Sequence, residues 1–171
     1  NDDTIFGPTP IWGDWRDGPG VDARLREVLE AAETLVRDRL AAYGRGAARY
    51  GLIHADMRLA NLLIDGGDTR LIDFDDCGFG WFMYDFAAGI SFMEEHPQVP
   101  ALREAWLDGY RAVRPLDRED EVELDSFIML RRMALLAWTG SHAGTDLARS
   151  QAPHFAAGTA RLAEAYLARF A

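Results

Sequence analysis

The sequence predicts a mainly α-helical domain with one small embedded β-hairpin, α+β overall. Three observations support this fold class. Long stretches carry apolar residues at helical spacing, two short apolar runs flank an Asp-Gly-Gly-Asp turn, and prolines or glycines separate the remaining segments. The 171 residues are enough for one domain with a sizeable core.

The first long helix is expected within residues 21–44. Its apolar residues recur on one stripe, and Gly44 suits a C-terminal stop. The opposite face is charged and is expected to be solvated, through Arg26, Glu30, Glu33 and Arg37.

Three short strands are expected next. "YGLIH" is an apolar run that predicts a buried strand, and "LLID" and "TRLID" predict a hairpin around Gly66-Gly67, because glycines accept a positive φ without penalty. Beyond the hairpin the sequence predicts helices near 81–95, 101–113, 119–140 and 155–170. The expected breaks between them are Pro97, Pro100, Pro115, Gly140, Gly144 and Pro153.

The hairpin gathers polar side chains at one edge. If Gly66-Gly67 is a two-residue turn, Asp65 faces Asp68, Asn61 lies opposite Ile72, and Asp73 follows at the same end. The loop before the hairpin adds His54 and Asp56.

An Asn amide oxygen and an Asp carboxylate are hard-oxygen ligands that suit Mg²⁺ better than zinc. Asn61 and Asp73 are therefore the candidate metal ligands. Asp56, on the same loop, is placed to accept a proton from a hydroxyl or to orient it. This set is typical of phosphoryl transfer, in which a protein positions the acceptor and neutralises phosphate charge with metal.

"HADMRLAN" resembles the catalytic loop, and "LIDFDDCGFGWFMYDFA" the metal loop, of the aminoglycoside phosphotransferase and choline kinase superfamily. The match is dense over residues 50–90. This resemblance implies a protein-kinase-like C-terminal lobe, with ATP and Mg²⁺ as cofactors and a small-molecule hydroxyl as acceptor.

The resemblance also implies a role for each residue. Asp56 would be the catalytic aspartate, and Asn61 and Asp73 would hold Mg²⁺ between the ATP phosphates. Asp85 would brace the catalytic loop through backbone N–H groups, and His54 would be a structural residue of the same loop. Asp75 is either a support for metal or phosphate or a turn residue.

A complete kinase also needs a Gly-rich loop over the phosphates and a strand lysine. The chain contains no lysine and begins at Asn1, so the N-terminal ATP lobe is expected to be absent from it. Within residues 1–171 we expect a leading segment (1–20), the catalytic and metal loops (50–90) and a helical substrate subdomain (91–171). The isolated chain is expected to be inactive.

The net charge of the chain limits the classes of partner that it is expected to bind. With 28 acidic and 18 basic residues the formal net charge is -10, which argues against nucleic-acid binding and is compatible with a cationic acceptor. The carboxylates Glu94, Glu95, Asp120, Glu121 and Glu123 are expected to be mostly plain surface. The single cysteine fits a cytoplasmic protein, and no apolar run approaches the ~20 residues that span a bilayer.

Two other classes stay open. A non-catalytic kinase-like binding module is the main alternative. A metal-dependent hydrolase would need further His or Asp ligands at regular spacing, and the sequence has none.

Overall fold

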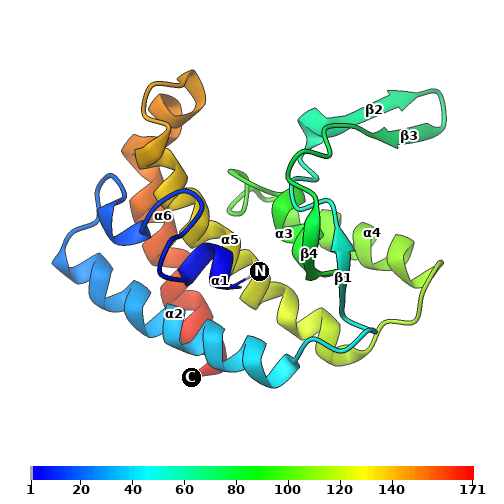
Figure 1. Cartoon of the computed structure of the whole chain (residues 1–171), viewed down its shortest axis with the longest axis horizontal. Coiled ribbons are helices and arrows are strands. Elements are labelled where there is room, and N and C mark those ends of the chain that lie inside the picture. Colours follow the sequence, from blue (N-terminus) through cyan, green and yellow to red (C-terminus); the bar gives the residue numbers. More distant parts are fainter. Residues whose placement is uncertain (1) are drawn as a thin grey trace.

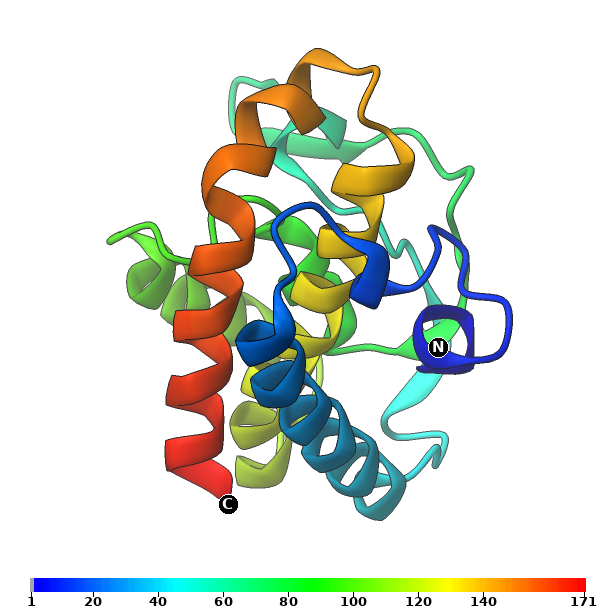
Figure 2. The same cartoon turned by 90° about the vertical axis from the view of Figure 1, so that its left-hand side faces the viewer.

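Three long helices form the body of the fold. The helices α2 (Ala23–Tyr43), α5 (Arg118–Ser141) and α6 (Asp146–Phe170) pack against one another, as Figures 1 and 2 show from two sides. The computed structural model describes residues 2–171. The apolar stripes of these helices meet in one core, whose fully buried side chains include Leu29, Val36, Leu40, Phe127, Leu130, Met133 and Leu136. The predicted fold class is confirmed.

Helix α2 begins and ends where its sequence predicts. The Asp22 side chain accepts a hydrogen bond from the backbone N–H of Leu25 at 2.8 Å, and Gly44 follows the helix with a φ of 77° that favours glycine. One prediction about this helix is wrong. Glu33 is buried rather than solvated, because its carboxylate accepts a hydrogen bond from the indole N–H of Trp15 at 2.8 Å.

The β-hairpin forms in the predicted register. Strands β2 (Leu62–Asp65) and β3 (Asp68–Leu71) are antiparallel, Asp65 faces Asp68, and the backbone N–H of Ile72 donates to the carbonyl of Asn61 at 3.1 Å. Figure 1 shows the hairpin projecting away from the helical body.

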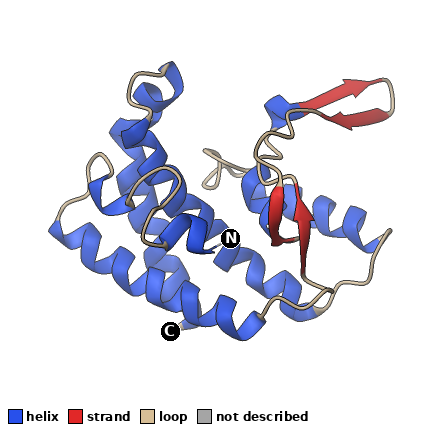
Figure 3. Cartoon of the chain, in the orientation of Figure 1, coloured by secondary structure: helices blue, strands red, loops and turns tan. Residues whose placement is uncertain are grey.

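The strand predicted at "YGLIH" forms, but its partner strand was not predicted. Strand β1 (Tyr50–Ile53) pairs antiparallel with β4 (Gly78–Trp81), so the expected helix over 81–95 is wrong at its start. The helix that follows, α3 (Tyr84–Gly89), is much shorter than predicted. In β1 only Ile53 is buried, whereas Leu52 is 66% exposed, so this strand is not the buried one that its sequence indicated. Figure 3 shows both strand pairs on the same side of the molecule.

The helices near the C-terminus agree with the predictions except at one boundary. Helix α4 (Val99–Arg111) lies within two residues of its expected bounds, and α5 within one. Helix α6 begins at Asp146 rather than near 155, because Thr145 caps it by accepting from the backbone N–H of Ala148 at 3.2 Å. Pro153 therefore lies inside α6 and does not break it.

The leading segment lies against the helical body. It contains the short helix α1 (Asp2–Phe6) and a 3-10 turn η1 (Trp15–Asp17), and a second 3-10 turn, η2 (Leu59–Asn61), precedes β2. Trp15 is buried in the core. Trp12 is half-buried, and the guanidinium of Arg131 lies over its ring, 5.0 Å from the ring centroid.

Several carboxylates that were expected on the surface are buried in ion pairs. Glu94 pairs with Arg132 at 2.6 Å between side chains that are 1% and 4% exposed. Glu123 pairs with Arg39, and Asp120 accepts a hydrogen bond from the Tyr43 hydroxyl. These groups are structural partners of arginine and tyrosine, so the prediction of plain surface is wrong for them. No helix within residues 2–171 combines the length and apolar character that crossing a membrane requires.

Candidate active site

The loop after β1 turns sharply and buries two of the predicted site residues. Ala55 has a φ of 64°, in the left-handed region that a residue with a Cβ rarely adopts, while His54 and Asp56 are both buried. The backbone N–H of Asp56 donates to Nδ1 of His54 at 3.3 Å. Nδ1 is then an acceptor, so Nε2 carries the proton and donates to the carbonyl of Ile72 at 3.0 Å. His54 thereby links the loop of Asp56 to the residue before Asp73.

Asp85, on α3, accepts hydrogen bonds from the backbone of this turn. Its two carboxylate oxygens accept from the N–H of His54 at 3.1 Å and from the N–H of Ala55 at 2.7 Å. Burial raises the pKa of the Asp85 carboxyl above its usual value, while the two backbone donors oppose this shift. These contacts are those expected of a brace for the loop.

We expect Asp85→Ala to lower the free energy of unfolding by about 1–3 kcal/mol, because it leaves two backbone donors of a strained turn without their acceptor. Chemical denaturation of the chain measures this change. Asp75→Ala is the matched control, since Asp75 is exposed and its loss should stay within about 0.5 kcal/mol. Equal effects of the two substitutions would contradict the bracing role.

Asp56 is surrounded by three donors. Arg131, from α5, donates to Oδ1 at 2.9 Å, and the side-chain amide of Asn61 donates to Oδ2 at 3.1 Å. Arg58, two residues along the loop, contacts both oxygens at 3.0 Å. The carboxylate is thus held between two guanidinium groups.

Asn61 and Asp73 lie at the same end of the hairpin. The hydrogen bond from Ile72 to Asn61 pairs their backbones there, and Asp73 is the next residue. The amide nitrogen of Asn61 donates both of its hydrogen bonds to Asp56, one to the backbone carbonyl at 2.8 Å and one to the carboxylate at 3.1 Å. Its amide oxygen is therefore the atom left for a cation. Asp73 is exposed and has a φ of 62°, a second strained backbone position beside the site.

The donor set fits the predicted metal. One amide oxygen and one carboxylate are the oxygen ligands that Mg²⁺ takes, and Mg²⁺ is usually bound by one or two protein ligands together with substrate phosphates. The metal-binding role of Asn61 and Asp73 stays a prediction. Asp75 is exposed two residues further on, and its predicted support of metal or phosphate stays a prediction as well.

Two arginines of the site were not predicted. Arg58 lies inside the motif around Asp56, so its place in "HADMR" was an available signal. Arg131 is 75 residues away from Asp56 in sequence, and its only signal was an Arg-Arg pair within the apolar stretch "FIMLRRMALLAW".

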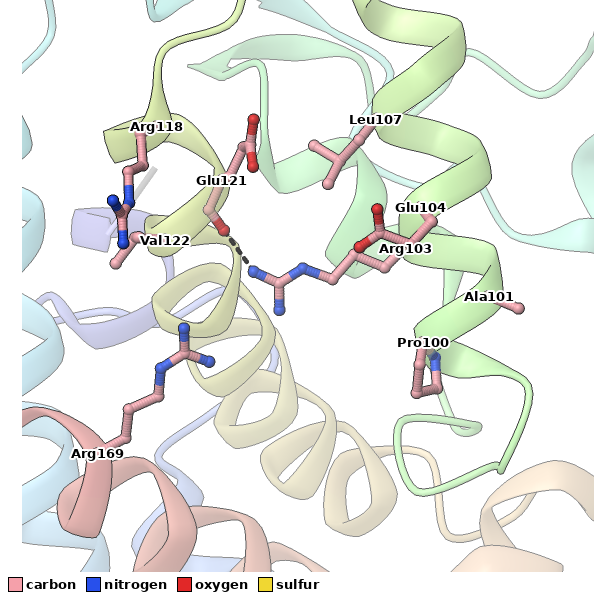
Figure 4. A pocket seen from close by; sticks show the side chains of 9 residues that line it. All are labelled: Pro100, Ala101, Arg103, Glu104, Leu107, Arg118, Glu121, Val122 and Arg169. Carbon is pink, nitrogen blue, oxygen red and sulfur yellow. Dashed lines mark hydrogen bonds between the residues drawn. The ribbon is translucent and has the colours of Figure 1, made fainter.

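The structure has a cavity of about 250 Å³ against the catalytic loop. It is lined by the leading segment, the β1–β4 pair and α5, and its polar lining includes Thr4, Asp76, Tyr84 and Arg131. A larger cavity of about 600 Å³ lies between α4 and the start of α5, where Arg103 donates to the backbone carbonyl of Glu121 (Figure 4). Its lining contains none of the predicted site residues, so it has no part in the candidate active site.

The sequence profile of the phosphotransferase enzyme family matches residues 12–121, which include all of the predicted site residues but not Arg131. The chain belongs to this family. A solved structure of a microcompartment-associated aminopropanol kinase is 46% identical, with a TM-score of 0.92 over 99% of this chain and 53% of that one. The chain is also 39% identical over 75 residues to the homoserine kinase of Neisseria meningitidis serogroup B, which is 42% of this chain and 25% of that protein.

A third relative shows the same fold at lower identity. The amicoumacin kinase hAmiN, solved with AMP-PNP, Ca²⁺ and Ami, is 22% identical and has a TM-score of 0.63 over 82% of this chain and 46% of that one. The chain therefore spans about half the length of these solved kinases, and it is homologous to kinases of small molecules.

Proposed function

We propose that the chain is the C-terminal lobe of an ATP-dependent kinase that transfers the γ-phosphate to a hydroxyl group of a small molecule. One observation carries the proposal: one loop and one hairpin bring Asp56, Asn61 and Asp73 to the same end of the hairpin. The Asn61 amide donates to the Asp56 carboxylate, and the Asn61 carbonyl accepts from Ile72, the residue before Asp73. The family and the resemblance of the whole chain to an aminopropanol kinase support it.

In this proposal each residue of the site has its own role in the reaction. Asp56 accepts the hydrogen bond of the acceptor hydroxyl and orients its oxygen for attack on the γ-phosphorus. Asn61 and Asp73 would hold Mg²⁺, which offsets the negative charge of the phosphates. His54 and Asp85 keep the loop of Asp56 in its strained turn through the hydrogen bonds described above.

Arg58 has to move for this chemistry to occur. It occupies both oxygens of Asp56, and its side chain is 35% exposed, so it can turn outwards without leaving a buried site. A guanidinium that leaves Asp56 has a strong alternative partner in the transferred phosphate, to which it can donate two hydrogen bonds. We therefore expect Arg58 to exchange Asp56 for phosphate when nucleotide binds.

The surface around the hairpin supports the presence of a second lobe. Apolar side chains gather on the two strand pairs and the loops beside Asp73, where Ile64 is 76% and Phe79 is 71% exposed. Further exposed members are Leu52, Leu59, Leu63, Ile72 and Phe74. Such a concentration of exposed apolar side chains in one region of a domain is typical of an interface. We propose that the ATP-binding lobe covers this apolar surface in the longer protein. That lobe would correspond to the half of each solved relative that this chain does not span.

The proposed acceptor is a small amino alcohol. The relative of 46% identity is an aminopropanol kinase, and a net charge of -10 is compatible with a cationic acceptor. The test is ADP release by the full-length protein with Mg²⁺, ATP and a panel of amino alcohols, each matched with the alcohol that lacks the amine. We expect turnover that prefers the amine-bearing member. No turnover with any hydroxyl compound, together with binding of the same compounds, would favour the non-catalytic binding module.

A further inference from the structure

We propose that Arg131 is a positioning residue, which fixes the orientation of the Asp56 carboxylate during phosphoryl transfer. This inference rests on the proposed function, because it assigns Arg131 a part in the same reaction. It starts from the three donors around Asp56, which differ in how firmly each is held.

Arg131 is anchored on several sides. Its side chain is 5% exposed, and besides Asp56 it donates to the hydroxyl of Ser91 at 3.0 Å, to the hydroxyl of Tyr84 at 3.3 Å and to the carbonyl of Ala55 at 3.4 Å. The ring of Trp12 covers its guanidinium. A side chain with this many partners keeps one rotamer, so the position of its Nη2 atom is set by α5 and α3 rather than by Asp56.

The two oxygens of Asp56 are fixed by different groups. Arg131 holds Oδ1, and the Asn61 amide holds Oδ2 while also bonding the Asp56 carbonyl. Two rigid donors on the two oxygens define the plane of the carboxylate. Arg58 contacts both oxygens from the solvent side, so its departure opens the lone pairs that an acceptor hydroxyl needs, while the carboxylate keeps its orientation.

Charge gives a second reason for this arrangement. Asp56 is buried, and a buried carboxylate without a counter-charge is strongly disfavoured. When Arg58 leaves, Arg131 remains as the cation paired with Asp56, and Asp56 is the carboxylate to which Arg131 donates. A permanent partner on α5 thus allows Arg58 to exchange partners during the reaction.

The neighbouring residue offers a matched control. Arg132 is equally buried, but it pairs with Glu94 at 2.6 Å and bonds Thr159 at 2.9 Å, on the side of α5 that faces α6. Arg131→Lys and Arg132→Lys therefore make the same chemical change in adjacent buried residues, and only the first touches Asp56. Thermal unfolding of each variant accounts for the loss of stability that both share.

The test is steady-state kinetics of the full-length enzyme at temperatures where each variant is folded. We expect Arg131→Met to lower kcat on the order of 10²-fold, because a carboxylate free to rotate loses its alignment with the acceptor. The Michaelis constant for ATP should change by less than about threefold, since phosphates are not among its partners. Arg131→Lys should recover part of the loss, and Arg132→Lys should keep the kcat of the wild type.

A double-mutant cycle separates positioning from packing. In the Asp56→Asn background, Arg131→Met should lower kcat by less than about twofold, because Arg131 acts through Asp56. A full additional loss in that background would show that Arg131 acts on the fold and would overturn the inference. So would a wild-type kcat for Arg131→Met. If the wild-type enzyme transfers no phosphate, the proposed function fails and this inference fails with it.

Discussion

Asp56→Asn should abolish most of the turnover of the full-length enzyme, with kcat lower by about 10²–10⁴-fold. Asparagine has nearly the shape of aspartate, and its amide oxygen can still accept from Arg131 at the Oδ1 position. It lacks the negative charge and the basicity that the acceptor hydroxyl requires. The affinity for ATP should remain near that of the wild type, since the phosphates are assigned to Asn61, Asp73 and the second lobe.

Coupled measurement of ADP release gives kcat, and titration with the Mg²⁺ complex of AMP-PNP gives the nucleotide affinity. Asp68→Asn is the matched control, because this exposed aspartate at the hairpin turn makes the same chemical change far from the acceptor. A variant Asp56→Asn that keeps more than about a tenth of kcat would show that Asp56 is not the catalytic group.

The parts of the fold that could be predicted are those whose signals are local. Helix α2 carries its own cap at Asp22 and its stop at Gly44, and the hairpin is specified by Gly66-Gly67 and the strands beside it. The register of the hairpin then determined where Asn61 and Asp73 lie. For the same reason the motif from His54 to Asp73 was predictable, since the residues that contact one another there are less than twenty positions apart.

The parts that were missed depend on distant partners. Strand β4 exists because it pairs with β1, for example Trp81 with Tyr50, and this pairing joins segments that are far apart in the sequence. The burial of Glu94 is decided by Arg132 on another helix. A carboxylate is expected on the surface unless its partner is known, so such ion pairs are not visible in one segment of sequence.

The same limit applies to the site. Arg131 reaches Asp56 from the middle of α5, and the sequence places it only within a helix whose neighbours are core residues. Its charge inside an apolar stretch indicated a buried partner but not which one. The identity of that partner required the packing of α5 against α3 and the catalytic loop.

The chain of 171 residues should fold by itself but neither bind ATP tightly nor transfer phosphate. Folding is expected because α2, α5 and α6 enclose a continuous core. Tight ATP binding is not expected, because Asn61 and Asp73 would supply only two oxygen ligands to a metal that the nucleotide phosphates would also have to bind. The chain has no lysine to hold these phosphates. A net charge of -10 also repels a polyanionic nucleotide from the exposed Asp73.

Circular dichroism and a cooperative thermal transition would establish that the chain is folded. Titration calorimetry with ATP and Mg²⁺ should then give no measurable heat of binding at micromolar concentrations, and incubation with amino alcohols should release no ADP. The full-length protein in the same buffers is the control and should do both. Micromolar ATP affinity or steady ADP release by the isolated chain would mean that these residues contain a complete phosphate site, and the proposal of a second, ATP-holding lobe would then be wrong.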